Sequence, residues 1–423
     1  MAKQIIIKGT PVVAANEVLV ADSNSKIPAV DGSAVTAMAG GNIAGTIPTA
    51  RLDTGTTANK LVVLGASGLP AVDGSLLTGI VSYTKSASDP TISTNPSGGV
   101  GTEWVNHTTG KQFICTDATA GANVWTCSGG GSGNIQLFHG KGTNYGYSCR
   151  QYDDLIEKYS YASDSNSVDS GQNMNWSGGE PGGGVSSATY GYVMIQHSSH
   201  SNTGTMRKYQ FNTSNDMTTV GNMSTGTTNR VQNNGTMSAT YGYCCGGGEP
   251  TEINVIDKWP FATDTNATDV GDLTQARRSG AATCSFDYGY MAGGSQEPPL
   301  YNIIDKWAFA TDANATDVGD LTGARGNNNH GAQSSTYGYS CGGQPENVIE
   351  KWSYATDANS TDVGDLLDSV RWCATSSSAN YGYRSGGYPP TDRIDKWSFT
   401  TDGNATDVGN LLANASQAVG NQY

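Results

Sequence analysis

One eighteen-residue stretch recurs along the chain and constrains the fold more than any other feature. Its clearest copy begins at Ile304 and reads IDKWAFATDANATDVGDL. The other copies, of which the first two are weaker, begin at Ile156, Met206, Ile256, Ile349 and Ile394. A repeat of this length, sustained at a nearly constant period, is typical of a solenoid or a propeller.

Two independent markers follow this period. The first is an aromatic anchor in each copy, with spacings of 50, 50, 48, 45 and 45 residues. The six anchors are Tyr159, Tyr209, Trp259, Trp307, Trp352 and Trp397. The second marker is Tyr-Gly-Tyr, which begins at positions 145, 190, 241, 288, 337 and 381 and is followed by a glycine pair in four cases. Two markers in step predict six copies of one structural unit.

Each unit divides into four strand-sized pieces. In the fourth repeat these are 281–286, 288–292, 302–309 and 315–321. Four antiparallel strands, repeated radially, predict an all-β, six-bladed β-propeller over residues 145–423. We expect the anchors to pack between neighbouring blades, where each buried ring contributes about 1.5–3 kcal/mol. We expect glycine where strands crowd toward the axis.

Composition supports this fold class and excludes several functions. Only 14% of residues are charged, Gly occurs 56 times, and the net charge is −14. Abundant small polar residues favour tight turns over helices. The acidic balance argues against nucleic acid and against anionic membrane surfaces as partners. No apolar run of about 18 residues is present, so no membrane insertion is expected.

The eight cysteines are too few for a disulfide scaffold. Cys149, Cys245 and Cys341 occupy the same repeat position, where we expect small buried strand residues. Cys115 and Cys127 are close enough in sequence to pair, and both the paired and the reduced state are consistent with the sequence. Cytoplasmic folding favours the reduced state.

The N-terminal residues 1–80 carry a different, shorter repeat. IPAVDGSAVTAM begins at Ile27, and LPAVDGSLLTGI begins 42 residues later, at Leu69. No segment here is long enough to bury both faces alone, so we expect a thin β shaft formed with partner chains, an intertwined homotrimer. A flexible linker is the alternative, and the apolar cluster 61–64 argues against it.

Two further regions lie between the shaft and the repeats. Residues 81–130 predict a small β module with strands at 100–106, 110–115 and 123–127. Residues 131–144 begin with a Gly/Ser-rich run and predict a hinge and entry segment.

These motifs resemble two known families. Tyr-Gly-Tyr with its glycine pair, followed by I-[DE]-K-W and a polar hairpin, resembles the kelch repeat, most clearly in repeats three to six. The segments GNIAGTIPTARL and LPAVDGSLLTGI, and the module that ends near Trp125, are similar to tail-fibre segments of tailed bacteriophages. Together the resemblances imply a tail fibre, tail spike or receptor-binding protein with a kelch-like propeller.

The phage resemblance also carries expectations about partners and location. It implies a homotrimer in the virion tail, made in the host cytoplasm and attached to other tail proteins through residues 1–80. It implies recognition of a host surface glycan or protein further along the chain. A non-adhesive structural decoration protein of a virion is an alternative, and a glycan-degrading depolymerase is another.

Antiparallel strands place alternate connections on opposite faces, which separates constant from variable loops. Connections between strands one and two, and three and four, are nearly invariant, and we interpret them as structural. The other two sets vary and carry arginine, aromatic and amide side chains suited to binding. The candidate receptor-binding residues are Arg277, Arg278, Gln296, Glu297, Arg325, Gln344, Arg371, Trp372 and Tyr388. Neutral drift between repeats is the alternative explanation.

The remaining chemistry is sparse. Asp264, Asn266 and Asp269, with their copies in later repeats, resemble a short array of calcium ligands. Asx turns that bond their own backbone explain the same pattern, and we favour them. No metal and no cofactor are expected. Catalytic residues are not expected either, because glycan cleavage needs paired carboxylates in a cleft.

The closing strand of the first blade has two candidates. One is the entry segment 135–139, and the other is the chain end, 415–423. We favour the chain end, because it joins the first and last blades in one sheet.

Overall fold

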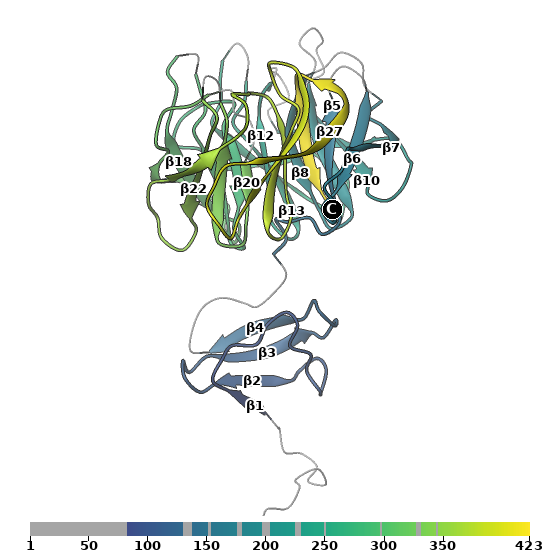
Figure 1. Cartoon of the computed structure of the whole chain (residues 1–423). Helices are drawn as coiled ribbons and strands as arrows, with labels where there is room; N and C mark the ends of the chain where they lie inside the picture. The colour runs from purple at the N-terminus through teal and green to yellow at the C-terminus, as the bar shows by residue number, and fades with distance from the viewer. Residues whose placement is uncertain are drawn as a thin grey trace, which may run out of the picture. The chain divides into compact units, whose positions relative to one another are not determined.

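The computed structural model of the protein describes residues 83–129, 138–150, 154–175, 180–196, 204–224, 230–248, 251–296, 298–326, 331–343 and 346–423. The expected shaft, residues 1–80, and most of the expected hinge lie outside these ranges. The described residues are all-β and include no helix, hence none that could cross a bilayer (Figure 1). All described residues belong to one compact unit, Tyr83–Tyr423.

The first described sheet is the expected small module. It contains β1 (Tyr83–Ser86), β2 (Glu103–Asn106), β3 (Gln112–Asp117) and β4 (Val124–Gly129), in that spatial order. The last three correspond to the three predicted strands. β1 was not predicted: its sequence YTKS has no alternation, and it joins the sheet parallel to β2. Phe113, Cys115 and Trp125 form the module's core.

Six further sheets follow, each with four antiparallel strands. The first combines β28 (Ala418–Gln422) with β5 (Tyr145–Arg150), β6 (Leu155–Ser160) and β7 (Val168–Asn173). The second contains β8 (Glu180–Ser186), β9 (Tyr190–Gln196), β10 (Thr205–Gln210) and β11 (Thr218–Asn222). The third contains β12 (Asn234–Met237), β13 (Tyr241–Cys245), β14 (Val255–Pro260) and β15 (Thr268–Asp272).

The remaining three sheets repeat the same order. They are β16 (Ala281–Cys284), β17 (Tyr288–Ala292), β18 (Ile303–Ala308) and β19 (Thr316–Asp320); β20 (Gly331–Gln333), β21 (Tyr337–Cys341), β22 (Val348–Ser353) and β23 (Thr361–Asp365); and β24 (Ala374–Ser377), β25 (Tyr381–Ser385), β26 (Thr391–Ser398) and β27 (Thr406–Ala415). The four strands predicted for the fourth repeat are confirmed to within two residues at each end.

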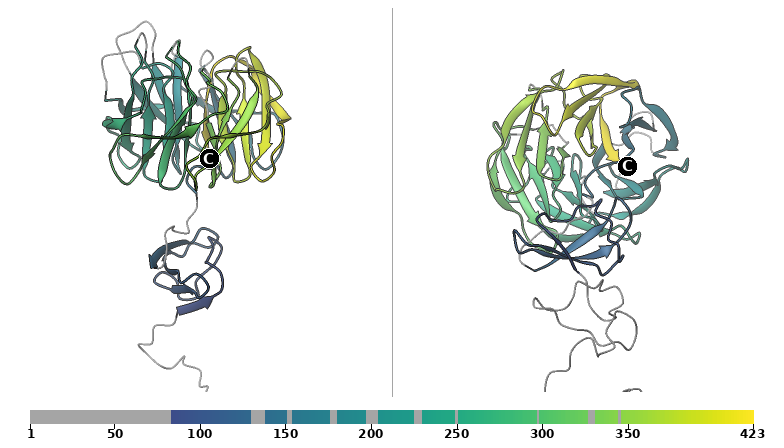
Figure 2. Two further views of the ribbon diagram at one scale, coloured as in Figure 1. Left: turned by 90° about the vertical axis from the view of Figure 1, so that its left-hand side faces the viewer. Right: turned by 60° about the horizontal axis from the view of Figure 1, so that its bottom comes forward.

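The first strands of the six sheets lie against one another. Contacts join β8, β12, β16, β20, β24 and β28 in this order, and β28 contacts β8 again (Figure 2). Every sheet is open, with two edges. At this meeting point, a Cβ on Gly184, Gly235 or Gly420 would strike the backbone of the adjacent first strand. Glycine is therefore required where the first strands crowd, as expected.

The C-terminal strand β28 belongs to the first sheet and not to the last. It pairs antiparallel with β5, with Gly420 opposite Ser148. Of the two candidates for this strand, the chain end is therefore the one that pairs. Residues separated by the whole repeat region thus share one sheet.

The third strand of each sheet contacts both neighbouring sheets, which explains the I-[DE]-K-W motif. Side chains alternate between the two faces of a strand. In β14, Asp257 and Trp259 point to the preceding sheet, where the Trp259 ring lies 6.0 Å from that of Tyr192. Ile256 packs with Trp307 of the following sheet. Because a sheet lies on either side, Ile256, Asp257 and Trp259 are all buried.

All six aromatic anchors are buried as predicted. Each packs against the second tyrosine of a Tyr-Gly-Tyr in a neighbouring sheet. Four of these contacts are ring pairs: Tyr209–Tyr147, Trp259–Tyr192, Trp307–Tyr243 and Tyr159–Tyr383. Trp352 and Trp397 lie in the same hydrophobic clusters as Tyr290 and Tyr339, respectively. The glycine between the tyrosines lies directly opposite the anchor of its own sheet, as Gly289 does with Trp307. A Cβ on Gly289 would strike the Trp307 ring.

The cysteines at the shared repeat position, Cys149, Cys245 and Cys341, are buried strand residues as predicted. Cys115 is buried in the core of the small module, opposite Trp125. None of the eight cysteines, all within the described ranges, forms a disulfide.

Candidate binding face

The connections of the six sheets divide into two faces, as the antiparallel order requires. We call the face with the connections between strands one and two, and three and four, the constant face. There Lys306 lies 4.3 Å from the ring centroid of Tyr288 and 2.8 Å from Asp357 of the next sheet. The same triad occurs with Lys208, Lys258, Lys351 and Lys396.

The polar turns of the constant face hold neighbouring sheets together. Asp317 accepts a hydrogen bond from the backbone N–H of Gly319, which is the predicted Asx turn. The prediction is wrong for the other two positions of the turn, because their side chains reach a different sheet. Asn314 accepts from the backbone of Asp272 at 3.1 Å, and Asp312 pairs with Lys258. The side-chain oxygens of Asp312, Asn314 and Asp317 therefore bind three different donors of the protein, in two sheets.

The entry segment also ends at the constant face. His139 lies beside Phe138 and Phe286, with its Nε2 3.1 Å from the carbonyl oxygen of Met237. The Gly140 carbonyl accepts hydrogen bonds of 2.7 Å from Gln333 and Gln422, which lie on first strands of different sheets. Burial lowers the pKa of His139 to about 4, so this imidazole is neutral at pH 7.

The other two sets of connections form the variable face. Within one sheet, the loop between strands two and three lies beside the connection that leads into the first strand. Arg278 and Ser295 exchange two backbone hydrogen bonds of 3.0 and 2.8 Å, and Arg371 and Tyr388 do the same at 3.0 and 2.7 Å. The variable loops are therefore anchored by a repeated backbone arrangement.

The expected exposure of Arg277 and Arg325 is wrong. Arg277 is completely buried, with Nη2 3.1 Å from the Asp305 carboxylate, and Arg325 places Nε 3.0 Å from Glu350. Asp305 and Glu350 are the acidic residues of I-[DE]-K-W, and both are fully buried. A buried carboxylate needs a cation and hydrogen-bond donors. These arginines therefore stabilise the core, and no ligand reaches them on the folded surface.

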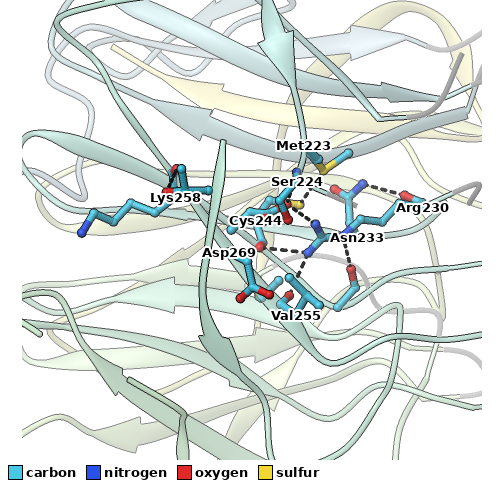
Figure 3. A network of polar contacts seen from close by, with 12 residues as sticks. Met223, Ser224, Arg230, Asn233, Cys244, Val255, Lys258 and Asp269 are labelled. Atoms are coloured by element: carbon cyan, nitrogen blue, oxygen red, sulfur yellow. Dashed lines mark hydrogen bonds and ion pairs between the residues drawn. The ribbon is translucent and has the colours of Figure 1, made fainter. Parts of the chain in front are cut away.

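A buried arginine accompanies the buried carboxylate in five of the six sheets. The pairs are Arg150–Glu157, Arg230–Asp257, Arg277–Asp305, Arg325–Glu350 and Arg384–Asp395. Figure 3 shows the Arg230 network, in which the guanidinium also donates to the backbone carbonyls of Cys244 and Val255 at 3.1 and 2.8 Å. Burial lowers the pKa of Arg277 and raises that of Asp395, and the partner charge opposes burial in both cases.

Two sheets depart from this arrangement in different ways. In the last sheet, Val370 occupies the place of the arginine, and Arg384 on β25 supplies the cation instead. In the second sheet, Arg207 occupies the place of the carboxylate and donates to the carbonyls of Met174 and Asn175 at 2.7 and 2.8 Å. A recurring arginine at the repeat spacing was the sequence signal for this structural role.

The other candidates fall into four groups. Arg278 is also buried, contrary to expectation, with Nε 3.5 Å from Glu252. Gln296 is exposed and accepts a hydrogen bond from the Tyr301 hydroxyl at 3.0 Å. Glu297 and Gln344 lie outside the described residues.

The last group, Arg371, Trp372 and Tyr388, forms one cluster on the variable face. The Arg371 guanidinium carbon lies 4.2 Å from the Trp372 ring centroid and 5.0 Å from that of Tyr388. The two rings are 5.8 Å apart and tilted by 58°. Tyr388 is 39% exposed, and Arg371 and Trp372 are partly buried.

Polar groups in the Arg371–Trp372–Tyr388 cluster lack protein partners. The buried Nε1 of Trp372 and Nε of Arg371 make no hydrogen bond within the described structure. Asp368, in the same connection, pairs with Arg393 at 2.6 Å and lies 3.8 Å from Arg384. Among the described residues, no carboxylate lies within ion-pair distance of Arg371. Sequence reasoning named the three cluster members but not their mutual contact.

Comparison with protein-family models and with curated proteins finds no match for this chain.

Proposed function

We propose that the six antiparallel sheets are the blades of a six-bladed β-propeller. Three observations support this architecture. The first strands contact one another in a sequence that returns to its start. The anchor–tyrosine packing includes Tyr159 with Tyr383, which connects the first sheet to the last. The Lys–Asp pairs likewise include Lys396 with Asp164, at 2.7 Å.

We propose that the protein is a bacteriophage tail fibre that attaches to a host surface glycan or protein through the variable face. The observation that carries this proposal is the contrast between the two faces. Lysine on the constant face is engaged by a tyrosine ring and a carboxylate in five sheets. The variable face carries a partly exposed Arg371–Trp372–Tyr388 cluster, in which Arg371 has no carboxylate partner among the residues that the structure describes. Aromatic and arginine side chains of this kind dominate binding energy at interfaces.

The resemblance of residues 1–80 to fibre segments adds the expected stem, and it implies a homotrimer. Light scattering on the full chain in solution tests this directly. We expect a mass near three times 44.0 kDa. A monomer contradicts the intertwined stem.

A matched pair of variants tests the attachment face. Tyr388 on the variable face and Tyr288 on the constant face are similarly exposed, at 39% and 36%. We expect the full-length protein to bind purified polysaccharides from bacterial surfaces on an array, Tyr388→Ala to reduce that binding, and Tyr288→Ala to leave it unchanged. The reverse pattern would overturn the assignment of the face.

The alternatives give different outcomes in the same assay. A trimer that binds no bacterial surface material favours a non-adhesive decoration protein. A bound polysaccharide that is shortened on incubation favours a depolymerase.

A further inference from the structure

We propose that the Arg371–Trp372–Tyr388 cluster is a subsite for the anionic group of an acidic saccharide, with a carboxylate or a phosphate as the charged group. This inference rests on the proposed attachment function and specifies the chemistry of its ligand.

The charge of Arg371 indicates an anion. Guanidinium groups bind carboxylate and phosphate in a planar, two-point geometry. The arginines of the five buried pairs already have carboxylate partners, and Asp368, the acid nearest in sequence to Arg371, is held by Arg393. Exposed Glu346 makes no ion pair with Arg371. In a chain of net charge −14, an arginine that has no carboxylate partner in the described part of the chain is a specific place for an anion to bind.

The aromatic neighbours indicate that the anion is attached to a ring with an apolar face. Trp372 and Tyr388 are tilted toward each other with Arg371 over both rings. The flat, apolar face of a sugar ring packs on aromatic side chains of this kind. Small anions alone would leave these aromatic contacts unused.

The backbone at the Trp372 position has the same left-handed conformation in three of the sheets. Trp372 has φ of 55°, and Gln232 and Ser279 have φ of 55° and 62° at the equivalent positions of two other sheets. A β-branched or bulky residue rarely adopts this conformation. In the sheet of β16–β19 the equivalent of Arg371 is Arg278, which Glu252 neutralises. Only the last sheet, among those described at this position, combines the free arginine with two aromatic rings.

The centre of the six sheets offers no comparable site. The cavity lined by Gly184, Gly235, Gln333 and Gly420 has a volume of about 40 Å³. Pockets for small molecules typically measure about 300–1,000 Å³, so a saccharide does not fit there.

The test uses the full chain labelled with 5-fluorotryptophan and observed by fluorine NMR. The chain has eight tryptophans, and Trp372→Phe identifies the Trp372 resonance by its loss. The ligands are methyl glucuronide, glucose 1-phosphate and methyl glucoside, which separate a carboxylate, a phosphate and a neutral ring. We expect at least one anionic sugar to shift the Trp372 resonance and the neutral sugar to shift it much less.

Charge removal then tests the role of Arg371. We expect Arg371→Gln to weaken binding of the anionic sugar by at least about tenfold, the loss of a charge-assisted hydrogen-bond pair. Lys306→Gln is the matched control, since Lys306 also lies over a tyrosine ring but pairs with Asp357; we expect no change in binding. Unchanged resonances of the other tryptophans establish that each variant is folded.

The results separate this inference from the attachment function. No response of Trp372 to either anionic sugar, an equal response to the neutral sugar, or unchanged binding by Arg371→Gln overturns the subsite. If the chain still binds bacterial polysaccharide with the expected loss in Tyr388→Ala, attachment stands without the subsite. If anionic sugars shift Trp372 but no bacterial polysaccharide binds, the subsite stands and attachment fails.

Discussion

The variable loops of the β16–β19 sheet and of the β24–β27 sheet share one backbone arrangement and use arginine in opposite ways. In both, an arginine in the connection exchanges two backbone hydrogen bonds with the loop after strand two. Arg278 is buried and neutralised by Glu252. Arg371 instead lies over Trp372 and Tyr388, and no carboxylate of the described ranges pairs with it. The comparison shows that two loops with the same backbone hydrogen bonds can place an arginine either in a buried ion pair or over exposed aromatic rings. Residue type alone therefore does not identify a binding arginine.

The largest expected effect is the loss of stability on replacing a buried arginine, compared with replacing the arginine proposed to bind a ligand. Arg277→Gln leaves Asp305 buried without its cation, which costs about 3–5 kcal/mol of unfolding free energy. Arg371→Gln removes a cation–π contact at a partly exposed site, and we expect it to lower the unfolding free energy by no more than about 1 kcal/mol. Chemical denaturation of both variants measures the difference. An Arg277→Gln protein as stable as the parent would place Arg277 back among the binding candidates.

A double variant checks the cause of that loss. Arg277→Gln combined with Asp305→Asn removes both charges, so part of the stability should return, because the penalty for an unpaired buried carboxylate disappears. If no stability returned, the loss in Arg277→Gln would come from the changed packing of the side chain and not from the unpaired charge of Asp305.

The fold was largely predictable because its signals are local and periodic. The anchor at Trp307 and the glycine at Gly289 recur in step, so strand positions and their pairing followed from the sequence. The burial of Asp305 and Arg277 was missed for a specific reason. Asp305 shares a strand face with Trp307, but a third strand with sheets on both sides has no solvent face, and a charged residue in such a strand must bring a partner.

The next prediction concerns how the stability contributed by His139, at the constant face, depends on pH. His139 is buried and neutral, with its pKa lowered to about 4 from 6.5. The unfolded chain therefore binds a proton more readily than the folded chain between these values. Stability from this residue is present above pH 6.5 and is lost as pH falls toward 4, by at most about 3 kcal/mol.

The variant His139→Phe should remove this dependence. The parent and variant are compared by denaturation at pH 7 and at pH 4.5, and the parent should lose more stability between them. Equal losses would show that His139 is accessible to protons in the folded state. The variable-face variant Arg371→Gln should retain the parent's pH dependence.

Substitution of two glycines compares a position in the repeated strands with a position in a variable connection. A Cβ at Gly289 strikes the Trp307 ring, whereas the nearest atom to a Cβ at Gly323, in a variable connection, is the end of the Arg325 side chain at 3.9 Å. We expect Gly289→Ala to lower the unfolding free energy by about 1–3 kcal/mol and Gly323→Ala to leave it nearly unchanged. Thermal unfolding followed by circular dichroism distinguishes them, and equal effects would contradict the proposed crowding.

The smallest expected effect concerns the lysines of the constant face. Replacing Lys306 tests whether such a lysine contributes as little to the unfolding free energy as Arg371 does. Lys306 is 16% exposed and Asp357 is 50% exposed, so solvent screens their pair. Lys306→Gln should cost no more than about 1 kcal/mol, and added salt should reduce the difference from the parent. A loss above that range would show that five such links act as one network. The ion pairs of the constant face would then stabilise the fold cooperatively, whereas Arg371 on the variable face would not. A constant-face variant could then serve as a binding control only under conditions in which its unfolding free energy equals that of the variable-face variant.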